Sequence, residues 1–173
     1  VVSKMSQTQV ERLFIKDKTS LQAQAWRITS EVTYDTSTNA VASSMSIMTG
    51  DGYGSLGGDN MTFSSGTFSF PKTGIYLIQP QAYLQYRSDA SNYSGAYISC
   101  TTDNSSYNFS AGAYGYTTAA GQHTGTFAQH IFDVTDVSTH KFKYYLQAHN
   151  GATFTGATNG FYTGVIIFRL GNT

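Results

Sequence analysis

Residues 66–85 constrain the fold more than any other part of the chain, because they hold two strand patterns separated by a turn. Phe68 and Phe70 alternate with small polar residues, so both aromatic side chains point to one face of a short strand. Pro71 and Gly74 then supply the restricted and the permissive backbone positions that a tight turn needs. The stretch therefore predicts a β-rich fold with a strand, a turn and a second strand at its centre.

The strand after this turn is apolar on both of its faces. Ile75 and Leu77 point to one side, while Tyr76 and Ile78 point to the other. The core of a two-sheet sandwich covers only one face of a strand, so the second face needs a different partner. We expect one face to serve the core and the other to contact another subunit, and the alternation alone leaves open which is which.

The rest of the chain from residue 21 also has strand character. About nine or ten short strands, with turns every eight to twelve residues and no helical stretch, predict an antiparallel sandwich. The clearest alternation lies at residues 141–149, and the last strand, at residues 161–170, is again apolar on both faces. A length of 173 residues fits one such domain, at residues 21–173.

The two strands that are apolar on both faces predict an oligomer. If they are neighbours in one sheet, the outer face of that sheet would leave a large apolar patch in a monomer, so we expect a subunit interface there. The residues predicted to form this trimer interface are Tyr76, Ile78, Tyr83, Tyr145, Val165 and Ile167.

Residues 1–20 differ from the domain in their charge. They hold six of the chain's 20 charged residues, more than an even share. Val10, Leu13 and Phe14 have helical spacing, but an isolated helix of this length is marginal in water. Of the two readings, a short helix and an extended arm laid on a neighbour, we prefer the attachment arm.

Composition narrows the range of partners. The formal net charge is +0, so no overall field attracts nucleic acid or an anionic membrane. The chain has no apolar run of eighteen residues, so we expect no membrane insertion. Cys100 is the single cysteine, which rules out a disulfide within the chain and fits a small core residue beside Ile98.

Motifs for catalysis and cofactor binding are missing from the sequence. There is no G-x-S-x-G elbow, and the glycines at residues 50–58 precede no Gly-Lys-Ser phosphate loop. We therefore predict neither an enzyme nor a cofactor. Asp133 and Asp136 are candidate calcium ligands, although two carboxylates supply only part of a shell of about six oxygens.

Aromatic residues in polar surroundings are the remaining chemical signal. Their flat apolar rings suit stacking on sugar rings, and the alternative is ordinary strand alternation combined with trimer contact. The aromatic residues that lie among Gly, Ser, Thr and Asn, and that we predict to face a ligand, are Tyr107, Phe109, Tyr114, Tyr116 and Phe154.

Three segments together resemble a known family. The pattern G-x-F-x-F-P-x-x-G-x-Y-x-I at residues 66–78 resembles the central motif of the C1q/TNF-like jelly rolls. Residues 161–168 resemble the family's terminal strand. Residues 131–137 lie where the family has an L-x-x-G-D-x-V segment, although the glycine–aspartate pair is missing here. The resemblance covers roughly residues 21–170 and implies a jelly-roll homotrimer with its inner sheets around a threefold axis.

The Gly- and Thr-rich loops, with segments such as residues 55–58, 101–107 and 132–136, also resemble C1q-like proteins of marine phages and other aquatic viruses. The chain has no Gly-X-Y repeat of the kind that precedes the domain in animal members. The resemblance therefore implies a non-enzymatic protein that decorates or cements a capsid on the virion surface, with residues 1–20 holding the major capsid protein or another virion protein. Two alternatives stay open, namely the receptor- or glycan-binding head of a phage tail or head fibre and a secreted C1q-like binding module.

Overall fold

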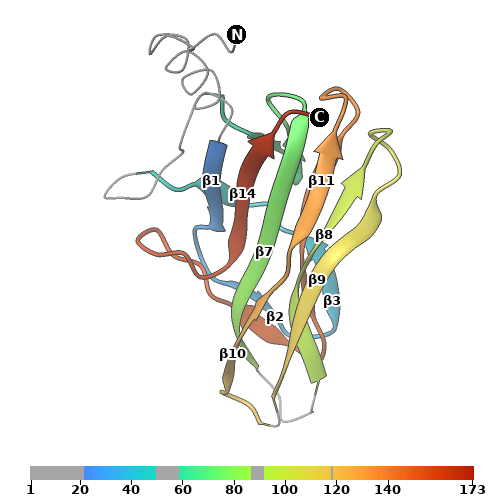
Figure 1. The fold of residues 1–173 in the computed structure, drawn as a ribbon. Coiled ribbons are helices and arrows are strands. Elements are labelled where there is room, and N and C mark those ends of the chain that lie inside the picture. Colours follow the sequence, from blue (N-terminus) through green and yellow to red (C-terminus); the bar gives the residue numbers. More distant parts are fainter. Residues whose placement is uncertain (1–21, 50–58, 87–91, 118) are drawn as a thin grey trace, which may run out of the picture.

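The computed structural model describes residues 22–49, 59–86, 92–117 and 119–173. All regular elements of these residues are β-strands, arranged in two antiparallel sheets. Figure 1 shows β1, β14, β7 and β11 side by side in one layer, with β8 and β9 belonging to the other. The all-β antiparallel class predicted from the sequence is confirmed, and none of the described residues forms a long apolar helix able to cross a membrane.

The first sheet is built around β7, whose two edges are both paired. Along one edge lie β14 and β13, and along the other lie β11 and β10. The strands of this sheet are β1 (Gln22–Ile28), β2 (Val32–Tyr34), β4 (Met45–Ile47), β7 (Gly74–Tyr86), β10 (His123–Phe127), β11 (His130–Val134), β13 (Ala152–Phe154) and β14 (Gly164–Gly171).

The second sheet is built around β12 and β8, which pair with each other over most of their length. β9 extends this sheet beyond β8, and β6 and β3 pair with the other edge of β12. Its strands are β3 (Thr38–Val41), β5 (Thr62–Ser64), β6 (Thr67–Ser69), β8 (Asn92–Thr101), β9 (Asn108–Thr117) and β12 (Lys141–Ala148).

The described residues contain fourteen strands, where the sequence predicted about nine or ten. The difference comes from short elements. Residues 61–70 form a hairpin of two three-residue strands around a turn in which Ser65 and Gly66 both have positive φ. Residues 126–134 contribute to both β10 and β11, and the glycine- and threonine-rich segment at 150–160 contains β13.

The core between the sheets is rich in aromatic residues. Phe68 and Phe142 of the second sheet stack with ring centroids 4.6 Å apart, and Trp26 of the first sheet meets the Phe68 ring edge-on at 5.4 Å. The alternation at residues 141–149 puts four apolar side chains on one face, and all four are buried: Phe142, Tyr144, Leu146 and Ala148. The hydroxyl of Tyr144 reaches across the core and donates a hydrogen bond to the Gln81 carbonyl at 2.6 Å, so its burial leaves no unsatisfied donor.

The turn at the start of β7 depends on a glycine. Gly74 has a φ of 146°, and a Cβ there would lie 2.4 Å from the Gly171 carbonyl oxygen. The guanidinium of Arg169, which is buried, donates to the Thr73 carbonyl through both Nε and Nη2. These contacts fix the start of β7 against the end of β14.

The predicted arm lies outside the described residues. This includes Val10, Leu13 and Phe14, so attachment through residues 1–20 stays a prediction.

Candidate functional site

The outer face of the first sheet carries a continuous apolar row. In the strand register, Ala23 lies opposite Phe168, Phe168 opposite Leu77, and Leu77 opposite Ile131. Ile131 is 65 % exposed and the other three are half-buried, so the row is open to solvent in a single chain. We call these four residues the apolar row. Such a face is typical of a protein surface that contacts another protein.

The face of β7 that was predicted to contact another subunit lies in the core instead. Tyr76 and Ile78 point into the core, as do Val165 and Ile167 of β14, and each of the four is at most 2 % exposed. The Tyr76 hydroxyl donates to the Lys72 carbonyl at 2.9 Å, so this ring lies inside the sandwich with its polar end satisfied. The prediction that these four side chains face another subunit is therefore wrong, and β7 presents Ile75 and Leu77 instead.

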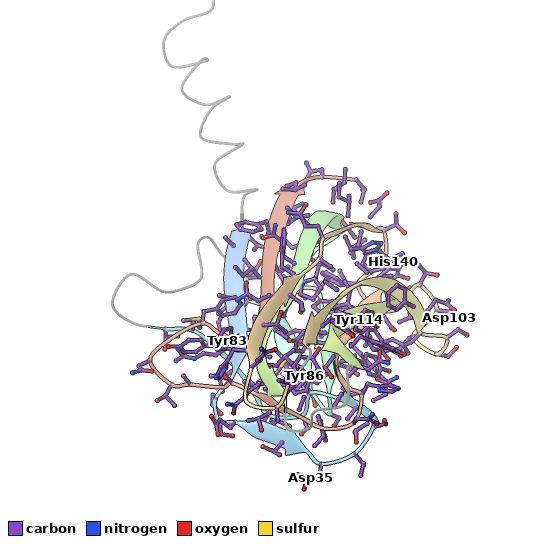
Figure 2. The ribbon with its side chains drawn as sticks, turned by 90° about the horizontal axis from the view of Figure 1, so that it is seen from below. Asp35, Tyr83, Tyr86, Asp103, Tyr114 and His140 are labelled. Carbon is purple, nitrogen blue, oxygen red and sulfur yellow. The ribbon has the colours of Figure 1, made fainter. Side chains whose placement is uncertain are left out.

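The other two predicted interface residues lie on opposite faces of the molecule. Tyr83 is on the outer face of the first sheet, where its ring stacks on His123 at 5.4 Å. With Phe127 and Tyr162 it lines an open cleft of about 350 Å³. Tyr145 is on the outer face of the second sheet, so these two residues cannot share one flat interface. Figure 2 shows Tyr83, which belongs to β7 of the first sheet, apart from Tyr114, which belongs to β9 of the second.

The outer face of the second sheet is covered by aromatic side chains. They come from β8, β9 and β12 and from the loop before β9, and we call them the aromatic face. Its members are Tyr93, Tyr97, Tyr107, Phe109, Tyr114, Tyr116 and Tyr145.

The rings of the aromatic face contact one another across strands. Tyr97 stacks on Tyr145 with centroids 4.6 Å apart and an interplanar angle of 3°. Tyr97 also contacts Phe109 at 5.4 Å, and Tyr93 meets Tyr114 edge-on at 5.5 Å. The Tyr97 hydroxyl donates to Asn39 Oδ1 at 2.8 Å, and burial raises the pKa of this phenol. Tyr97 is therefore the fixed centre of the face.

Glycines in β8 and β9 make room for these rings. Gly112 lies opposite Tyr97, and a Cβ at position 112 would lie 2.6 Å from the Tyr97 Cβ. Gly95 lies opposite Tyr114, and a Cβ at position 95 would lie 2.1 Å from the Ala113 carbonyl oxygen. Two neighbouring outward-facing rows of the β8–β9 pair thus combine an aromatic residue with a glycine, which keeps this part of the surface flat.

A lysine and a histidine border the aromatic face at its ends. The Lys143 ammonium lies 4.2 Å from the centroid of the Tyr107 ring, a cation–π geometry. The His149 ring lies 5.1 Å from the Tyr93 ring, and its Nδ1 is buried without a hydrogen-bond partner among the described residues.

Four of the five predicted ligand-facing aromatics lie together on this face: Tyr107, Phe109, Tyr114 and Tyr116. The fifth, Phe154, is fully buried, so its assignment to a ligand-facing loop is wrong. It lies in β13 and pairs with Leu84 and Val32, which turns its ring into the core. Sequence reasoning missed Tyr93 and Tyr97, although their spacing around Gly95 was a signal.

The candidate calcium ligands do not form a cluster with other acids. Asp133 lies on the exposed side of β11, and Asp136 Oδ1 accepts hydrogen bonds from Ser138 N–H and Oγ–H at 2.8 and 2.7 Å. Those bonds lower the pKa of Asp136 and are typical of a turn. Among residues 22–49, 59–86, 92–117 and 119–173, no three His, Cys, Asp or Glu side chains are placed to hold a metal ion.

Comparisons with known proteins identify the fold. No protein-family model matches the chain, and no curated protein sequence matches it. Among solved structures, the Eiger TNF structure from S. frugiperda matches with a TM-score of 0.66 and 10 % identity, over 89 % of this chain and 95 % of that one. Murine APRIL at pH 5.0 matches with a TM-score of 0.63 and 11 % identity, over 87 % and 99 % of the two chains. The chain therefore has the TNF-like jelly-roll fold, as the motif at residues 66–78 predicted.

Proposed function

We propose that this protein is a non-enzymatic virion structural protein that forms a homotrimer and decorates the outer surface of a phage or aquatic virus particle. The apolar row supports the assembly part of the proposal. The resemblance of the glycine- and threonine-rich loops to viral C1q-like proteins supports the virion part. Residues 1–20 would contact the major capsid protein or another virion protein.

The apolar row supports self-association because the whole outer side of β7 lacks charge. The outward residues of this 13-residue strand are aliphatic, aromatic or amide side chains, and the neighbouring row joins Ala25, Ile166 and Gln79. Covering such a surface with another copy of itself removes apolar area from water, at about 25 cal/mol per Å². The C1q/TNF-like resemblance supplies the threefold arrangement.

A charge placed in the apolar row tests the trimer. Ile131→Lys leaves the core untouched, because its side chain is largely exposed in the single chain. We expect the wild-type protein to sediment as a trimer at micromolar concentration and Ile131→Lys to sediment as a monomer, since the interface would bury an unpaired ammonium. Val137→Lys is the matched control, because Val137 is 37 % exposed in the turn after β11. A monomeric wild type, or an Ile131→Lys trimer as stable as the control, would contradict the proposal.

Attachment to a particle needs a separate test. A decoration protein should be present in hundreds of copies per particle, on the order of the capsid lattice, whereas a fibre head should be present in a few to a few tens. Removing residues 1–20 should abolish binding to the capsid and leave the trimer intact. Loss of trimerisation in that variant would make the segment part of the assembled core instead.

The aromatic face favours a second candidate function, the glycan-binding head of a tail or head fibre. Its rings are open on the side opposite the apolar row, where a trimer would still expose them. A secreted C1q-like binding module is the third reading, and it shares the same two faces. Copy number per particle separates the first two readings.

A further inference from the structure

We infer that the aromatic face binds a neutral carbohydrate that lies across the exposed rings of β8 and β9. The inference uses a different surface from the proposed trimer interface and stands independently of the virion assignment. It is carried by three properties of this face, which are its open rings, its flatness and the absence of charged residues from β8 and β9.

The open rings lie along β9. Phe109 is 60 % exposed, Tyr114 39 % and Tyr116 61 %, although all three belong to a regular strand. Beneath them, Tyr97 is nearly buried and locked by its stack on Tyr145 and its bond to Asn39. A rigid lower ring with open rings around it is a prepared stacking surface, because little side-chain freedom is lost when a ligand binds.

The flatness comes from Gly95 and Gly112, which lie opposite Tyr114 and Tyr97. Same-face residues two positions apart along a strand are separated by ~7 Å. The ring positions along β9 therefore offer several successive contacts to an extended chain. A flat face with repeated contacts fits a polymer of rings better than a compact ligand, which would need a cavity.

The few charged residues around the aromatic face indicate which class of ligand fits it. Neither β8 nor β9 contains a charged residue. The charges at the border come from β12, where Lys143 is engaged with the Tyr107 ring and Lys141 lies opposite Thr101 at the end of β8, away from the exposed rings of Tyr114 and Tyr116. A nucleic acid or an anionic lipid surface would need cations here. Sugar rings have apolar C–H faces that pack on aromatic rings, and hydroxyls that pair with the phenol and amide groups. A neutral carbohydrate is the ligand complementary to this surface.

Affinity electrophoresis tests the inference directly. The full-length protein is run through native gels containing mannan, xylan, laminarin or galactan, with heparin as an acidic comparator. We expect at least one neutral polysaccharide to retard the protein and heparin to leave it unaffected. Tyr116→Ala and Phe109→Ala should each weaken the dissociation constant by about tenfold or more, equivalent to about 1.4 kcal/mol.

Phe127→Ala is the matched control, because Phe127 is also 60 % exposed but lies on the outer face of the first sheet. It should leave the retardation unchanged. Tyr116→Phe keeps the ring and should retain most of the binding. The inference would be overturned if heparin alone retards the protein, or if none of the four neutral polysaccharides does. It would also be overturned if Phe127→Ala loses as much affinity for the polysaccharide as Tyr116→Ala.

Carbohydrate binding can be tested separately from trimer formation. If the trimer proposal holds, Ile131→Lys should bind a soluble oligosaccharide of the retarding polymer with the wild-type dissociation constant per site. It should lose only the multivalent gain on the polymer. A wild-type monomer that binds neutral polysaccharide would support the carbohydrate site while refuting the trimer.

Discussion

The hydroxyl of Tyr86 accepts a hydrogen bond from the backbone N–H of Ser94 at 2.8 Å and donates one to the Gly115 carbonyl. Tyr86 ends β7 of the first sheet, whereas its two partners belong to β8 and β9 of the second. One buried side chain therefore joins the central strand of the first sheet to the two strands that present the aromatic face. Burial raises the pKa of this phenol, which keeps it neutral and able to donate.

Replacing Tyr86 by Phe should lower the free energy of unfolding by about 1–3 kcal/mol. The change leaves the Ser94 N–H, which is fully buried, without its acceptor. Urea unfolding monitored by circular dichroism measures the effect. Tyr116→Phe is the control, because the Tyr116 side chain is largely exposed, and its stability should match the wild type. Equal stability of the two variants would mean that the bridge contributes nothing.

Replacing Gly95 by Ala should destabilise the fold by about 1–3 kcal/mol, because the new methyl group would collide with the Ala113 carbonyl and push β9 away from β8. Gly125→Ala is the matched control, since a Cβ at position 125 meets nothing within 4 Å. Thermal unfolding of the two variants under the same conditions checks this. A Gly95→Ala protein as stable as Gly125→Ala would show that the strands separate freely.

Stability should fall as the pH rises above about 9. Burial raises the pKa of the Cys100 thiol from 9.0 to about 11, so the folded state keeps a proton that the unfolded state loses. Between these two values the unfolded state binds fewer protons, and the free energy of unfolding should drop by about 1 kcal/mol per pH unit from this group. Urea unfolding at pH 8, 9, 10 and 11 measures the slope.

Cys100→Ala separates the thiol from the tyrosines. The variant should lose the part of the slope between pH 9 and 10, while the fall above pH 10 persists. That later fall comes from buried phenols such as Tyr144, whose pKa lies well above 10.0. An identical slope in wild type and variant would show that Cys100 ionises freely in the folded protein.

The two faces of β7 show which part of the fold could be predicted from the sequence and which part could not. Alternation correctly predicted that Tyr76 and Ile78 share one face while Ile75 and Leu77 share the other. It could not choose the core face, because both faces are apolar and the choice depends on what the opposite sheet offers. The Tyr76 ring lies 4.6 Å from the ring of Phe70, which in turn lies 5.7 Å from the ring of Phe142 in β12. β12 is far along the chain, so no local pattern could show that this face meets it.

Local alternation also predicted part of the aromatic face. Tyr114 and Tyr116 follow Gly112 with strand spacing, so local sequence places them on one face of β9. Their neighbour Tyr145 comes from a strand about 30 residues further on, and only the register of β12 against β8 brings it onto Tyr97. The prediction that Phe154 faces a ligand is wrong because its glycine- and threonine-rich surroundings are typical of a loop. In the structure this segment is β13, which pairs with β2 and β7.

The edges of both sheets have a consequence for how copies of this protein meet. Seven described strands are paired along one side only, and six of them, β2, β3, β4, β5, β10 and β11, are three to five residues long. The seventh, β9, is longer and is interrupted by a bulge opposite Ile98 and Ser99. Such edges present too few unpaired backbone groups in line to recruit a strand from another molecule. Crowded copies would thus be protected from fibrous, backbone-driven aggregation, and recognition between them would be left to side chains.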